Sequence, residues 1–333
     1  MRILAAAKSA CLVYAAAGAL SLLGAALTTA SAQNYPNQTL RFVVPFPPGG
    51  GLDAVARMLA PELQKSMGQT VVVENKAGGS GFIGTLTVTK AKPDGHTFMI
   101  QALGMSMNPS IYKNLPYDPV KELAPVSMIA SVPVVLAVGN HVKANNLQEL
   151  IALAKAKPGS IKGAAFVTGS ATVMFEMFKL QSGTDIHIVN YRGVGPALAA
   201  VTSGEGDFVI MDGGSVIGQI KSGRVRGIAV AAEKRIGEIP DIPTTAEAGL
   251  PEFKIEFWYA AFTTGGTPAP IVERLNAELN KAANNPEVAA KLRGLGLNPA
   301  NGSAADFTTR HHREMKEWAD VVKRSGFVPL EAN

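Results

Sequence analysis

Short apolar runs alternate with longer amphipathic segments from residue 40 to residue 102. The short runs are rich in β-branched and aromatic residues, which predicts strands, and the longer segments repeat apolar residues at helical spacing. A β-α-β-α-β order predicts a parallel sheet with right-handed crossovers. The expected strands are Leu40–Phe46, Thr70–Glu74 and Thr97–Ala102, and the expected helices are Leu52–Met67 and Gly81–Lys90.

The same alternation resumes in the middle of the chain and predicts a second doubly wound unit. Its helices are expected at 147–156, 171–181, 196–202 and 215–221, and its strands at 161–166, 186–190, 207–211 and 225–231.

Two long apolar runs separate these units. Ala124–Gly139 is longer than an ordinary strand of about five or six residues and is broken by Pro133, so we expect it to pass from one unit into the next. Lys254–Thr264 predicts the return crossing, followed by helices at 269–284, 286–294 and 303–325. The predicted fold class is therefore α/β, with two doubly wound lobes and two crossings. Lobe 1 is expected to comprise 33–133 and 255–333, and lobe 2 to comprise 134–254.

Residues 1–32 have the features of a secretory signal peptide. Arg2 and Lys8 give a positive start, residues 12–27 are an uncharged run rich in Ala and Leu, and Ala30-Ser31-Ala32 is a small-x-small triplet for signal peptidase. The alternative, a transmembrane anchor, needs about 20 apolar residues, which this run does not reach. We expect cleavage after Ala32 and export of the mature protein across the cytoplasmic membrane.

Composition narrows the chemistry. Cys11 is the only cysteine and lies in the segment that we expect to be removed, so the mature protein has no disulfide, thiol nucleophile or cysteine-based metal site. The net charge of +5 is small and spread along the chain, and the six tyrosines are not interleaved with basic runs. The sequence therefore gives no indication of nucleic-acid binding.

A glycine-rich turn follows the first expected strand. Phe46-Pro47-Pro48-Gly49-Gly50-Gly51-Leu52-Asp53 opens the first helix, where outward-facing N–H groups at the positive end of the helix dipole form an anion cradle. We expect the backbone to approach a ligand at Gly50 or Gly51, with positive φ there, and Asp53 to stabilise the loop. Residues 49–54 also match G-x-G-x-x-A, with Glu74 about 20 residues on, as in a dinucleotide site. A plain connecting turn is the other alternative, and export disfavours a nicotinamide cofactor.

Similar polar loops follow other strands. Ala77-Gly78-Gly79-Ser80-Gly81 opens the second helix, so two helix N-termini can converge on one anion. Thr168–Thr172 occupies the same position in the second unit, where its hydroxyls can cap the helix or bind a ligand. Tyr191-Arg192-Gly193 and Asp212-Gly213-Gly214-Ser215 follow the next two strands, at the edge where open α/β sheets bind ligands.

No motif of a known catalytic site is present. The five histidines form no H-x-x-x-H pair, and no G-x-S-x-G sequence occurs. A Ser-His-Asp site assembled from distant residues stays open as an alternative. Met174, Phe175, Met177 and Phe178 are expected in the core, and Trp258 and Tyr259 either in the core or in the wall of a cleft.

Taken together, the chain resembles the tripartite tricarboxylate transporter substrate-binding protein family, also called the Bug family of periplasmic solute receptors. The resemblance covers essentially all of 35–333. Each motif is weak alone, but their order makes the set specific. The motifs are Tyr35-Pro36, Leu40–Asp53, Val73–Gly81, Pro93–Thr97, Leu115–Pro119, Tyr191-Arg192-Gly193, Ile239–Gly249 and Gly266-Thr267-Pro268.

The resemblance implies a periplasmic binding protein fold of type II, a venus flytrap whose cleft closes on a small carboxylate. It implies no catalytic residue, cofactor or metal. The expected partners are a mono-, di- or aromatic carboxylate and the permease subunits of a tripartite tricarboxylate-type transporter, and we expect a monomer. The ligand-binding residues carried over are Phe46, Pro48, Gly50, Gly51, Gly79 and Ser80 in lobe 1, and Gly169, Ser170, Thr172, Tyr191 and Asp212 in lobe 2.

Two positions depart from the family pattern. Val173 replaces a frequent His, and Asn190 replaces a frequent Pro before the Tyr. Loss of an imidazole predicts a less polar end of the cleft, which favours a less hydrophilic or aromatic carboxylate over citrate. The alternative functions are a ligand-sensing receptor for a periplasmic sensor domain and a secreted hydrolase.

Overall fold

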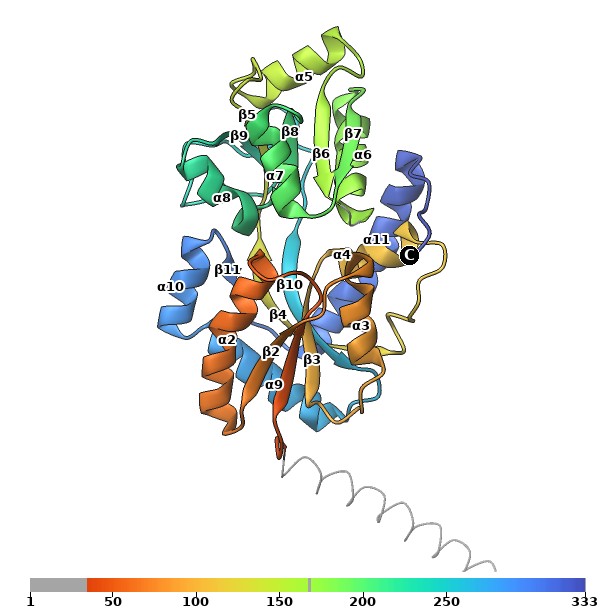
Figure 1. Cartoon of the computed structure of the whole chain (residues 1–333), viewed down its shortest axis with the longest axis vertical. Coiled ribbons are helices and arrows are strands. Elements are labelled where there is room, and N and C mark those ends of the chain that lie inside the picture. The colour runs from red at the N-terminus through yellow and green to blue at the C-terminus, as the bar shows by residue number, and fades with distance from the viewer. Residues whose placement is uncertain (1–34, 167–168, 333) are drawn as a thin grey trace, which may run out of the picture.

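A computed structural model describes residues 35–166 and 169–332, and these residues form two α/β lobes stacked along the long axis of the molecule (Figure 1). The expected signal peptide, Cys11 and Thr168 lie outside the described residues. The α/β fold with two lobes that the sequence predicts is confirmed. Among the described residues, no helix is both long enough and apolar enough to cross a membrane.

The first lobe is built on a six-stranded sheet with the order β11-β4-β10-β3-β1-β2. The strand β1 pairs in parallel with β2 and β3, as the sequence predicts, whereas β10 runs antiparallel between β3 and β4. The strands are β1 (Leu40–Val44), β2 (Val71–Asn75), β3 (Thr97–Ala102), β4 (Leu123–Val132), β10 (Phe257–Thr264) and β11 (Asn298–Pro299). The helices are α2 (Gly51–Met67), the 3-10 turn η1 (Gly79–Gly81), α3 (Phe82–Thr89), α4 (Gly104–Ile111), α9 (Ala269–Ala283), α10 (Pro286–Gly294) and α11 (Ala304–Ser325).

The second lobe is built on a five-stranded sheet with the order β7-β6-β8-β5-β9. The strand β6 pairs in parallel with β7 and β8, while β5 runs antiparallel to β8 and β9. Its strands are β5 (Val134–Gly139), β6 (Lys162–Phe166), β7 (His187–Tyr191), β8 (Phe208–Asp212) and β9 (Val225–Val230). Its helices are α5 (Leu147–Ala156), α6 (Gly169–Ser182), α7 (Val194–Ser203) and α8 (Gly213–Lys221).

The expected crossing at Ala124–Gly139 consists of two strands in different sheets. Val132 at the end of β4 pairs with Phe257 of the first sheet, and Val134 at the start of β5 pairs with Asp212 of the second. Pro133 separates the two strands, and proline has no N–H to continue a ladder. The crossing strands run antiparallel to their neighbours, so both sheets are mixed.

One apolar core extends through both lobes, and a second cluster covers part of the second sheet. The core placement of Met174, Phe175, Met177 and Phe178 is confirmed, since none is more than 6% exposed. Trp258 is also fully buried. The helix α4 and the strand β11 were not predicted. The helix α4 is only eight residues long and contains Pro109, and β11 has only two residues.

Candidate functional site

The loops that follow β1, β3 and β8 meet the first turn of α6 between the two sheets. A Cβ atom added at Gly104, the first residue of α4, would lie 3.3 Å from Oγ of Ser170 in α6. Tyr259 of β10 donates a hydrogen bond of 2.8 Å to Asp212 at the end of β8. In each sheet these strand ends flank the switch points between β1 and β3 and between β6 and β8, where open α/β sheets bind ligands.

The glycine loop (residues 46–51) presents backbone to this junction. Gly49 has φ +89°, whereas Gly50 is the N-cap of α2 with φ −83° and ψ 170°. The positive φ expected at Gly50 or Gly51 is therefore found one residue earlier. A Cβ atom at Gly50 would meet no atom within 4 Å, but one at Gly51 would lie 2.5 Å from the Tyr259 hydroxyl. Gly50 thus borders open space, while Gly51 packs against Tyr259.

A polar network holds the glycine loop in place. The Asp53 carboxylate accepts hydrogen bonds from the Gly49 N–H at 3.0 Å, from Arg57 and from Asn75, and Asn75 also donates to the Phe46 carbonyl. Burial raises the pKa of Asp53, but the bonds from Arg57, Gly49 and Asn75 outweigh it and lower that pKa overall. The expected stabilising role of Asp53 is confirmed.

The second loop, at residues 78–81, has a left-handed backbone throughout. Gly78, Gly79 and Gly81 have positive φ, and Ser80 has φ +53°, which is uncommon for a residue with a side chain. The Phe46 ring lies over Gly81, where an added Cβ atom would be 3.2 Å from it. The two loops that the sequence selected are therefore neighbours.

Gln101, at the end of β3, was not singled out from the sequence. Its buried side chain donates to the Thr85 hydroxyl, which in turn donates to the Gly81 carbonyl. These two hydrogen bonds connect β3 to the second loop through Thr85. In the sequence, Gln101 can be recognised only by its position near the carboxyl end of a strand, and the apolar residues around it make that position hard to notice.

Four of the helices that begin at this edge lack side-chain caps, whereas Asp212 caps α8. Within the described part of the chain, no side chain caps the N-termini of α2, α3, α4 or α7. By contrast, Asn146, Asn285 and Ser303 cap α5, α10 and α11. Helix N-termini without caps leave N–H groups for water or an anion, and the helix dipole favours negative charge there.

The second lobe contributes hydroxyl groups that are bonded within their own lobe. The Thr172 hydroxyl donates to Asn190 at 3.0 Å, and the Tyr191 hydroxyl donates to Glu205 at 3.3 Å. Ser170 is buried against Gly104, and Gly169 begins α6. Of the residues predicted in lobe 2, Ser170 and Asp212 have contacts that reach the first lobe.

Asp212 is buried and already engaged. Its carboxylate caps α8 by accepting from the Ser215 N–H and hydroxyl, and it also accepts from Tyr259. Burial raises the pKa of Asp212, although these hydrogen bonds oppose the shift. The pKa of Tyr259 is also raised, by burial and by the neighbouring Asp212 carboxylate. Tyr259 is thus a buried residue at the junction of the lobes, where the sequence left open a place in the core or in the wall of a cleft.

Val173 and Glu74 bear on two of the alternatives. Val173 is fully buried, so it gives no support to the expected loss of polarity on a ligand-facing surface. Glu74, the acidic residue of the dinucleotide pattern, forms a bidentate pair with Arg41 at 2.8 and 2.9 Å. The Glu74 carboxylate thus joins β2 to β1 through an ion pair with Arg41 on the surface of the sheet.

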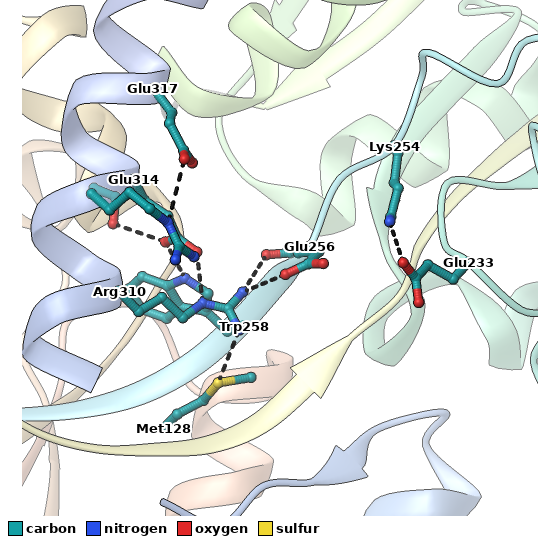
Figure 2. A network of polar contacts seen from close by, with 10 residues as sticks. Met128, Glu233, Lys254, Glu256, Trp258, Arg310, Glu314 and Glu317 are labelled. Atoms are coloured by element: carbon teal, nitrogen blue, oxygen red, sulfur yellow. Dashed lines mark hydrogen bonds and ion pairs between the residues drawn. The ribbon is translucent and has the colours of Figure 1, made fainter. Parts of the chain in front are cut away.

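A second polar cluster lies behind β10. Glu314 of α11 accepts from Trp258 at 2.7 Å and from Arg310 at 2.7 Å, and Arg310 also pairs with Glu256 (Figure 2). Ser106 of α4 lies 2.7 Å from Nδ1 of His311. Ser106 and His311 are both fully buried, so this serine–histidine pair is out of reach of a substrate.

Two surface grooves lie away from the junction. One of about 630 Å³ follows residues 109–122, and one of about 480 Å³ follows residues 220–242. Their linings contain none of the predicted ligand-binding residues. We place the candidate site at the junction because backbone donors, two glycine loops and both sheets meet there.

Two α/β lobes with backbone-lined loops at their junction define a solute-binding protein. The chain belongs to the family described as tripartite tricarboxylate transporter family receptor, which matches residues 55–327. It is 36% identical over 320 residues to protein BugT of Bordetella pertussis, covering 92% of this chain and 97% of BugT. The resemblance to the Bug receptors is confirmed.

Solved structures agree with this assignment. The chain is similar to the periplasmic binding protein BugD, with a TM-score of 0.82, 30% identity and coverage of 89% of this chain and 100% of BugD. It is equally similar to Rpa4515 of R. palustris, solved with adipate, with a TM-score of 0.82, 31% identity and coverage of 89% and 100%.

Proposed function

We propose that this protein captures a small organic carboxylate between its lobes in the periplasm and delivers it to a tripartite tricarboxylate-type permease. In this proposal the signal peptide is cleaved after Ala32. The lobes comprise 33–133 with 255–333 and 134–254, and the clamp binds its ligand without chemical turnover. The observation that carries the proposal is the meeting of the uncapped N-termini of α2, α3 and α4 with the start of α6 at one junction.

The junction suits an anion that is held by dipoles. Its loops present backbone N–H groups, and the open space beside Gly50 gives a ligand access to the first turn of α2. Prearranged dipoles stabilise a carboxylate in a site from which water is excluded. The adipate held by Rpa4515 supports a carboxylate as the ligand class.

Native mass spectrometry of freshly purified mature protein tests the ligand class. We expect a retained small acid, and calorimetric titration of the emptied protein with adipate, malate and benzoate should identify the acid that fits best. Adipamide, which has no charge, is the matched control and should not bind. Equal binding of adipamide and adipate, or no binding of any acid, would contradict the proposal.

Arg192 provides a check on the dipole-based site. This exposed residue follows β7 and is the arginine nearest in sequence to the predicted ligand residues of lobe 2. We expect Arg192→Gln to weaken acid binding by less than about 1 kcal/mol, as for an exposed ion pair. A loss of about 3 kcal/mol or more, the range for breaking a buried charge pair, would identify Arg192 as the main anion ligand. The measurement is the same calorimetric titration.

A further inference from the structure

The hydrogen bond between Tyr259 and Asp212 joins the two lobes. Tyr259 belongs to β10 of the first sheet, and Asp212 ends β8 of the second. The hydroxyl donates to Oδ1 at 2.8 Å, and the two residues are only 3% and 7% exposed. A hydrogen bond to a buried carboxylate is stronger than a neutral one, and its loss leaves the charged group with fewer donors.

This bond lies beside both crossings of the chain. Asp212 pairs with Val134, the first residue of β5, and the next N–H, of Gly213, donates to the Pro133 carbonyl at 2.7 Å. Phe257, two residues before Tyr259, pairs with Val132. The bond therefore spans the point at which the chain passes from one sheet to the other.

The strand β10 is fixed on its other face as well. Neighbouring residues of a strand point to opposite faces, and Trp258 donates from the opposite face to Glu314 of α11 (Figure 2). Glu314 in turn pairs with Arg310. Trp258 is fully buried, so β10 packs against α11 on this face while the Tyr259 side chain is buried on the other.

The Tyr259 hydroxyl also lies close to the first turns of α2 and α8. A Cβ atom at Gly51 would lie 2.5 Å from it, and one at Gly214 in the first turn of α8 would lie 3.8 Å from it. The Tyr259 hydroxyl thus lies between the first turn of α2, which carries the glycine loop, and the first turn of α8, which Asp212 caps.

We infer that Tyr259 is a positioning residue for ligand binding, which fixes the glycine loop of one lobe relative to α8 of the other through the buried Asp212 carboxylate. We call the Tyr259–Asp212 hydrogen bond the brace. In this inference Asp212 acts on the ligand through the brace and not by direct contact. The inference rests on the proposed function, because it assigns the brace to a site that closes between the lobes.

Hydrogen exchange of the ligand-free full chain tests the brace. In Tyr259→Phe we expect at least tenfold faster exchange at the N–H groups of Gly213 and Ala231, which bond across the crossing, and at Ala54 in the first turn of α2. Tyr35→Phe is the matched control, since it removes a buried hydroxyl that donates to the Gly95 carbonyl elsewhere in the first lobe. Faster exchange confined to β10, or equal effects in both variants, would overturn the inference.

Ligand binding gives the second readout, with adipate as the probe. Tyr259→Phe and Asp212→Ala should weaken adipate binding at least tenfold, while Tyr35→Phe changes it less than twofold. Asp212→Asn keeps an oxygen that can accept from Tyr259 and from the Ser215 N–H, so it should lose less affinity than Asp212→Ala. Equal losses in Asn and Ala would show that an oxygen able to accept from Tyr259 does not restore binding, which would overturn the indirect role of Asp212.

The two proposals fail in different ways. Wild-type protein that binds no acid contradicts the proposed function, and the exchange measurement on ligand-free protein then decides the brace by itself. Wild-type protein that binds adipate with normal affinity in Tyr259→Phe contradicts the brace and leaves the carboxylate site standing.

Discussion

His311 shows how burial controls the charge of a single side chain. Its ring packs between Trp258, Phe262 and Phe307 and is fully buried. Burial, followed by the neighbouring His312, lowers the pKa of His311 to about 4 from an ordinary value near 6.5. Neutral His311 is therefore the form that fits the folded protein, with Nδ1 next to the Ser106 hydroxyl.

This pKa predicts an acid-sensitive contribution to stability. Between about pH 6.5 and pH 4 the unfolded chain binds a proton at His311 and the folded chain does not, so stability falls as the pH falls through that window. The contribution is about 3 kcal/mol. Urea unfolding at pH 7.5 and pH 4 should show wild type losing about 3 kcal/mol more than His311→Gln. Parallel losses in the two proteins would show that His311 does not titrate in this way.

Gly50 and Gly51 are adjacent but predict different outcomes. Gly50→Val places its side chain in open space with a backbone that valine tolerates, so stability should change by less than about 1 kcal/mol while acid binding falls at least about tenfold. Gly51→Val pushes against the buried Tyr259 and should cost about 1–3 kcal/mol of stability. Thermal melts and calorimetric titration on the same samples compare the two. Unchanged binding in Gly50→Val would place the anion site away from the glycine loop.

At the scale of the element, α2 and its preceding loop act as one unit. Asp53 ties the first turn of the helix to Gly49 and, with Asn75, to the end of β2. The N–H groups at the start of α2 have no partner within the helix, so they do not fix the loop that precedes it. The hydrogen bonds of Asp53 fix that loop instead.

Removal of the Asp53 carboxylate should loosen this unit. We expect Asp53→Ala to lower the free energy of unfolding by about 1–3 kcal/mol and to weaken acid binding, since the Gly49 N–H and Asn75 lose their acceptor. Asp53→Asn keeps an acceptor oxygen and should lie between wild type and Asp53→Ala. Urea unfolding and titration measure both effects. An Asp53→Ala variant that binds as wild type does would show that the Asp53 hydrogen bonds are dispensable for the site.

Sequence periodicity predicted most elements because they bury one continuous apolar face. The strand β3 and the helix α9 are examples, since each has a clear apolar pattern. The helix α4 escaped prediction because a short segment with Pro109 gives no periodic signal. Both glycine loops could be located, because glycine clusters after strands are local features.

The junction residues could not be predicted in the same way. The role of Tyr259 depends on Asp212 and Gly51, which lie far from it in the sequence and belong to other elements. Gln101 supports a loop through Thr85, and no local pattern marks that contact. Prediction of such residues requires the register of β10 between β3 and β4, which hydrophobic periodicity does not specify.

At the scale of the whole molecule, two lobes with a shared junction predict closure on a ligand. A ligand that contacts both lobes favours the arrangement that brings them together, by its differential affinity for that arrangement. Small-angle scattering should show a smaller radius of gyration in saturating adipate than without it, whereas adipamide should leave the radius unchanged. An unchanged radius with adipate bound would contradict the two-lobe clamp.

The uncapped helix starts also bear on how such a receptor changes its ligand during evolution. A backbone N–H is present whatever side chain a non-proline residue carries, so substitutions in the loops leave these donors in the chain. Thr172, Tyr191 and Arg192 lie on the second lobe, where each substitution alters shape or polarity without remaking the cradle. Under the proposed function, gene duplicates can therefore diverge toward new acids through the second lobe while the first lobe keeps the carboxylate cradle.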